Sequence, residues 1–131
     1  MNIQLFKRLS ITSLITLVLI STAMGHHSFA QFDPAKTNVL TGTVRAFEFN
    51  YPHTWIWINV PGDAEPWGFE NASPVELNRI SGWTRASLKV GDKISVKYCG
   101  LKSGKHGGAF INVTLPDGRV LTGQAFHCQK K

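Results

Sequence analysis

The alternation of apolar and polar residues predicts a chain built mainly from β-strands. Residues 54–60, TWIWINV, alternate most clearly, with the isoleucines on one face and Trp55 and Trp57 on the other. The same analysis predicts strands at residues 38–50, 67–70, within 87–100, at 107–115 and at 119–126. The alternation of the first strand slips near Ala46, which indicates a β-bulge.

The period changes to that of a helix in residues 73–83, SPVELNRISGW. Ser73 and Glu76 have capping-box spacing, Pro74 suits the first helical position, and Gly82 can end the element. Three strands, a short helix and two or three further strands follow the order of the OB-fold, a small partly open barrel. We therefore expect an all-β, OB-fold-like barrel of five to six strands with one helix between the third and fourth. A small β-sandwich with an incidental helix is the alternative.

The first 25 residues have the pattern of a secretory signal peptide. Lys7 and Arg8 precede an apolar run of about a dozen residues, which is shorter than the ~20 residues needed to span a bilayer. Small residues follow, so that cleavage after Ala23 or after Gly25 is expected. An uncleaved N-terminal anchor is the alternative. We therefore expect residues 1–25 to be a leader and residues 26–131 to form one periplasmic or secreted domain.

The charge of the mature chain is moderately basic. Cleavage after Gly25 would remove two basic residues and lower the formal net charge from +6 to +4. The remaining lysines are scattered, and in an exported protein they favour solubility over nucleic-acid binding. We expect a monomer whose partner is an envelope protein or a small ligand.

The two cysteines, Cys99 and Cys128, are expected to form a disulfide in an oxidising compartment. The bond would pin the C-terminal tail to the domain and stabilise it by roughly 3–4 kcal/mol. Two free thiols are the alternative. A redox-active pair is disfavoured because no Cys-x-x-Cys spacing is present.

Several segments of the mature chain resemble a known family. The segments HHSFAQFD, LTGTVRAFEFNYPHTWIWINV, WGFENASPVELNRISGWTRASLKVGDKISV and VTLPDGRVL are similar to the exported bacterial domain-of-unknown-function family 6152 (DUF6152). The sequence departs from that family at Tyr51, where an asparagine is expected, and in its cysteine pair. The resemblance implies a periplasmic OB-like domain and brings no activity with it.

Three histidines are candidate metal ligands: His26, His27 and His53. Cleavage after Gly25 would make His26 the N-terminus, where its α-amine and Nδ1 chelate one ion, and a further imidazole would complete a nitrogen set suited to Cu(II). Cleavage after Ala23 would place His26 third, which also chelates Cu(II) or Ni(II). His106 is expected in a mobile loop, and His127 lies beside the cysteine. The alternative is that His26 and His27 are solvated and His53 bonds a backbone carbonyl.

The second candidate site is an aromatic surface formed by Trp55 and Trp57. OB-fold sheets use such surfaces to stack ligands, so the pair predicts a protein- or glycan-interaction surface that needs no metal. The alternative is that other residues cover both rings.

Catalysis has little support in the sequence. No nucleophile elbow and no zinc-protease motif is present, and no catalytic residue is assigned. Glu70 is the one carboxylate singled out as a candidate, and we expect it to bond the backbone at the start of the helix. The sequence therefore predicts a non-enzymatic binding protein, with copper as the candidate cofactor.

Overall fold

The computed structural model describes residues 29–124 and residue 128. The chain divides into two compact units, Met1–Ala30 and Gln31–Lys131, and the second unit holds the strands of the described residues. The predicted leader, both predicted cleavage sites, His26, His27 and His127 lie outside the described residues. Within the described part of the chain, no helix is both long enough and apolar enough to cross a membrane.

The described part of the second unit contains six strands and one α-helix. In chain order these are β1 (Phe32–Phe49), β2 (Thr54–Asn59), β3 (Trp67–Asn71), α2 (Pro74–Ser81), β4 (Lys93–Leu101), β5 (Gly107–Thr114) and β6 (Val120–Thr122), and a 3₁₀ helix, η1 (Phe29–Gln31), precedes β1. The predicted order, with one helix between the third and fourth strands, is confirmed. β1 begins earlier than predicted and β6 is shorter than predicted.

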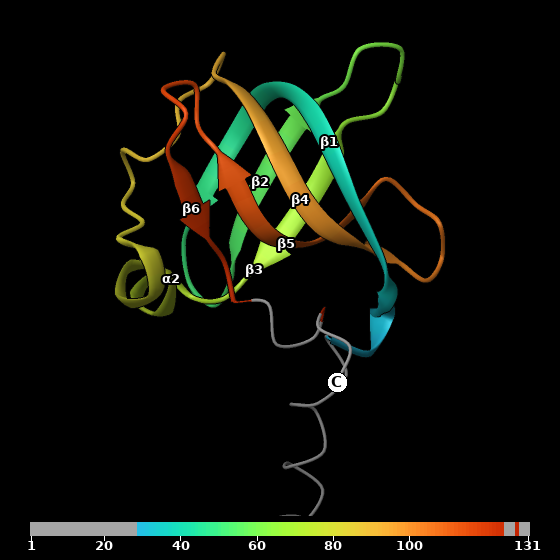
Figure 1. Ribbon diagram of the computed structural model, residues 1–131, viewed down its shortest axis with the longest axis horizontal. Coiled ribbons are helices and arrows are strands. Elements are labelled where there is room, and N and C mark those ends of the chain that lie inside the picture. Colours follow the sequence, from blue (N-terminus) through green and yellow to red (C-terminus); the bar gives the residue numbers. More distant parts are fainter. Residues whose placement is uncertain (1–28, 125–127, 129–131) are drawn as a thin grey trace, which may run out of the picture. The chain divides into compact units, whose positions relative to one another are not determined.

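Five of the strands close into a ring. The sheet order is β3-β2-β1-β4-β5-β6, and an additional parallel pairing of β3 with β5 joins the two ends. The long strand β1 makes this closure possible because its C-terminal half pairs with β2 and its N-terminal part pairs with β4. Figure 1 shows β1 as a bent strand that runs across the domain between these two partners. This closed order is that of the predicted OB-like barrel.

Local features of β1 allow it to bend. The register with β2 shifts between Val44 and Ala46, which confirms the predicted bulge near Ala46. At Gly42 a Cβ atom would lie 2.6 Å from the carbonyl oxygen of Asn59, so only glycine lets β2 approach this closely. The bulge and the glycine lie next to each other, where β1 passes from one partner to the other.

The core consists of the side chains that point from the strands into the ring. Ile56 and Ile58 of β2 are fully buried, as the alternation predicted. Burying each such side chain contributes about 1.5–3 kcal/mol relative to leaving it exposed. Other fully buried large side chains include Trp83, Phe69, Phe110, Leu77 and Ile94.

The helix α2 lies beside β6 at one end of the ring (Figure 1). The carboxylate of Glu76 accepts hydrogen bonds from the backbone N–H and the hydroxyl of Ser73, and Gly82 ends the helix in the left-handed conformation. These are the helix boundaries that the sequence predicted. The indole N–H of the buried Trp83 donates to the carbonyl oxygen of Thr122, which ties the segment after the helix to β6.

Candidate functional site

Trp55 and Trp57 lie half-buried on the outer face of β2, because Ile56 and Ile58, which alternate with them, point into the core. Their rings stack with centroids 5.5 Å apart and planes 12° from parallel. The indole N–H of Trp57 donates to Oε1 of Glu48 at 3.1 Å. The six-membered ring of Trp57 lies against Gly68 of β3, where an added Cβ would come within 2.5 Å of Cζ3. We call Trp55 and Trp57, with Gly68 beneath the second ring, the tryptophan face.

Glu70 is a buried carboxylate next to Trp55 on the same outer side of the sheet. The register of β2 and β3 places the two residues opposite each other, and Glu70 is 6% exposed. One carboxylate oxygen bonds Nδ1 of His53, and the other accepts a hydrogen bond from Nε2 of Gln31 at 3.4 Å. These two donors offset part of the cost of removing the carboxylate from water.

A row of neighbouring residues connects Trp55 to the disulfide. The strand registers place Trp55 beside Glu70, Glu70 beside Ala109, and Ala109 beside Cys99. Side chains opposite each other in register point to the same side of a sheet. Cys99 is fully buried and is bonded to Cys128, with Cα atoms 5.7 Å apart, so the predicted disulfide is confirmed. The disulfide therefore lies on the same side of the sheet as the His53–Glu70 pair.

The predicted metal ligands fall partly outside the described residues. Of the three histidines proposed as ligands, the structure describes His53, and within the described ranges no group of three or more His, Cys, Asp and Glu residues is placed to hold a metal ion. His53 contacts the Glu70 carboxylate through Nδ1. A carboxylate on the second ring nitrogen is the arrangement that commonly orients histidine ligands of metals. The copper site stays a prediction.

The contacts of two residues differ from those predicted from the sequence. Glu70 does not cap the helix, because Glu76 occupies that role and Glu70 bonds His53 instead. His106, in the β4–β5 connection, stacks on Trp67 with ring centroids 4.5 Å apart and planes 6° from parallel. Sequence reasoning missed this stacking and the contact of Gln31 with Glu70 because each joins positions 39 residues apart, and no local pattern relates them.

Comparison with known proteins gives one match. The sequence profile of DUF6152, described as a family of unknown function, matches residues 15–110, which is more than two thirds of the chain. No protein of curated function and no solved structure matches the chain.

Proposed function

We propose that this chain, which belongs to the DUF6152 family, is an exported binding protein whose tryptophan face docks a protein partner. Two features support export. Residues 1–25 have the sequence pattern of a signal peptide, and Cys99 is paired with Cys128, a bond that persists in oxidising compartments.

The stacked, half-exposed pair of Trp55 and Trp57 is the observation that carries the docking proposal. Tryptophan is enriched among the residues that dominate protein–protein binding energy. Packing on Gly68 and the hydrogen bond to Glu48 hold Trp57 in place before binding, which lowers the entropy lost on association.

A protein partner suits this surface better than a glycan. The indole N–H of Trp57 already donates to Glu48, and both oxygens of Glu70 already accept hydrogen bonds within the domain. The tryptophan face therefore offers mainly apolar ring surface, whereas a sugar needs hydrogen-bonding groups as well. Docking needs no chemical step, so we propose binding without catalysis.

Site-specific photocrosslinking in the native envelope tests this function. Asn59 is exposed on the same side of β2 as the two tryptophans, and a photoreactive residue there should give one defined protein adduct. Trp55→Ala and Trp57→Ala should each abolish that adduct. Lys97, which is exposed on β4, is the control position and should give no such adduct. A defined adduct that persists in both alanine variants would contradict the proposal.

Copper binding is the second candidate function. The contact of the Glu70 carboxylate with Nδ1 of His53 favours it, because histidine ligands of metals commonly bond a carboxylate through their other ring nitrogen. Cleavage at the end of the leader would supply the amine and imidazole of His26, and His27 is a further nitrogen donor. Such a set suits Cu(II), which favours nitrogen ligands in tetragonal geometry.

Calorimetric titration of Cu(II) into the secreted, mass-verified mature chain tests this second function. His53→Gln should weaken binding, and Glu70→Gln should weaken it by about 10–100-fold, the usual effect of removing an outer-shell partner. His106→Gln is the matched control and should leave binding unchanged. If the wild-type chain binds Cu(II) no more tightly than a variant lacking His26 and His27, the copper proposal is wrong.

A further inference from the structure

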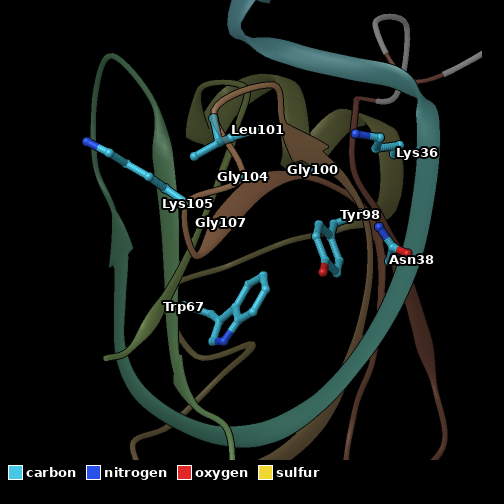
Figure 2. Close-up of a pocket in the computed structure, with 9 residues that line it drawn as sticks. All are labelled: Lys36, Asn38, Trp67, Tyr98, Gly100, Leu101, Gly104, Lys105 and Gly107. Atoms are coloured by element: carbon cyan, nitrogen blue, oxygen red, sulfur yellow. The ribbon is translucent and has the colours of Figure 1, made fainter. Parts of the chain in front are cut away.

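A pocket lies among side chains that face the inner side of the sheet, unlike the outer tryptophan face. Its volume is about 160 Å³, below the ~300–1,000 Å³ of pockets for drug-sized ligands, so it suits a single ring. We call it the rim pocket (Figure 2), and its lining residues are Lys36, Asn38, Trp67, Tyr98, Gly100, Leu101, Gly104, Lys105 and Gly107.

Trp67 and Tyr98 form an ordered aromatic wall of the rim pocket. Their ring centroids are 5.8 Å apart, in an edge-to-face arrangement. The indole N–H of Trp67 donates to Oδ2 of Asp63 at 2.7 Å, and His106 stacks on the indole, so this ring is held from two sides. Figure 2 shows the Tyr98 hydroxyl directed toward Trp67 in the centre of the pocket. Burial raises the pKa of Tyr98, so the hydroxyl stays a hydrogen-bond donor.

The charged groups that line the rim pocket are both positive. Lys36 comes from β1 and Lys105 from the β4–β5 connection, and none of the nine lining residues is a carboxylate. Figure 2 shows the Lys36 ammonium and the Asn38 amide on the β1 side, and Lys105 extending outward from the opposite side. The segment from residue 93 to residue 116 adds further lysines and contains no acidic residue.

Three carboxylates lie near these lysines without lining the rim pocket. Asp33 lies 3.6 Å from the Lys36 ammonium, but that lysine is 70% exposed and such surface pairs are weak. Asp63 accepts a hydrogen bond from the indole N–H of Trp67. Glu65 belongs to a neighbouring hollow that it shares with Lys105.

We propose that the rim pocket binds a carboxylated sugar ring, as found in an acidic glycan unit. The aromatic wall would contact the apolar C–H surface of the sugar. The Asn38 amide and the Tyr98 hydroxyl would bond its hydroxyl groups. Lys36, with Lys105 at the mouth, would pair with the carboxylate. A neutral sugar would forgo the charge pairing, and an aromatic acid would leave the amide and hydroxyl without partners, so both should bind more weakly.

An NMR titration of the isotope-labelled folded chain with sodium D-glucuronate tests this proposal. Saturable shifts are expected at the Trp67 indole N–H and at the amides of Gly100 and Gly107. Glucose and benzoate at equal concentrations should bind at least threefold more weakly. Lys36→Gln should weaken glucuronate binding by threefold or more, and added salt should weaken it in the wild type. The matched control Lys97→Gln, on the exposed side of β4, should bind as the wild type does.

Three results would overturn the proposal. The first is the absence of saturable shifts at the pocket residues of the folded wild type. The second is equal binding of glucose or benzoate, which would remove the carboxylated sugar as the preferred ligand. The third is unchanged glucuronate affinity in Lys36→Gln, because the charge pairing would then play no part. Because Lys36 is exposed, we expect this variant to fold, and its NMR spectrum checks that it does.

Discussion

Replacing Gly68 with alanine tests whether the tryptophan face is held in place by the sheet beneath it. A Cβ at this position would lie 2.5 Å from Cζ3 of Trp57 and 2.8 Å from Cη2, closer than unstrained carbon atoms approach. The indole ring is the group that must move, because it is the end of a side chain and half-exposed. Its movement would break the stacking with Trp55 and the hydrogen bond to Glu48.

The expected change in the free energy of unfolding combines three contributions. Overpacking of this kind typically costs about 1–3 kcal/mol, and the net value of one hydrogen bond is about 0.5–1.5 kcal/mol. Alanine also restricts the unfolded chain and returns about 0.4–1 kcal/mol. We therefore expect Gly68→Ala to lower the free energy of unfolding by about 2 kcal/mol, within a range of roughly 0.5–4 kcal/mol. Gly100→Ala is the matched control, because a Cβ there would meet only Tyr98, at 3.9 Å, and its cost should be close to zero.

Urea unfolding of the two glycine variants, in the wild-type background and with Trp57→Ala, measures this effect. Truncating the indole removes the clash, so the cost of Gly68→Ala should vanish in the Trp57→Ala background. The near-ultraviolet circular dichroism of the tryptophans should change in Gly68→Ala and not in Gly100→Ala. A cost that is equal in both backgrounds, or no larger than that of Gly100→Ala, would refute the reasoning.

Three further predictions concern stability. Removing the disulfide by Cys99→Ala with Cys128→Ala should lower the free energy of unfolding by about 3–4 kcal/mol, and urea midpoints that do not change would contradict this. Asn71→Ala should cost about 2–4 kcal/mol in the same assay, since this buried amide bonds three backbone groups, whereas Asn112→Ala should cost far less. Because burial raises the pKa of Tyr98 in the folded chain, its contribution to stability is complete below pH ~10 and is lost as the pH rises through the folded pKa. Tyr98→Phe should remove that loss when unfolding is followed against pH, and a pH dependence identical to the wild type would contradict the assignment.

Most of the fold could be predicted because most of its elements have a local signal. The alternation in β2 identified the buried isoleucines, the slip near Ala46 identified the bulge, and Ser73 and Gly82 set the ends of the helix. The N-terminal part of β1 could not be found in this way. It contains Asp33 and a proline and is mostly exposed, so it lacks an alternating pattern and is a strand because β4 pairs with it.

The candidate sites depend on contacts between residues far apart in sequence. His53 and Glu70 were both singled out, but their pairing follows from β3 lying beside β2 and from a side-chain contact that composition does not encode. The rim pocket depends on Lys36 and Tyr98 lying near each other across the β1–β4 pairing. The sequence thus identified several residues of the candidate sites, but it could not predict the contacts between them.

The affinity of the crosslinked partner for the purified domain tests the central proposal most directly. Titration of that partner into wild type, Trp57→Ala and Lys97→Ala isolates the contribution of the tryptophan face. We predict that Trp57→Ala weakens binding by at least tenfold, the loss expected for a dominant interface residue, and that Lys97→Ala changes it less than twofold. Equal affinity of wild type and Trp57→Ala would contradict the proposal that this face docks the partner.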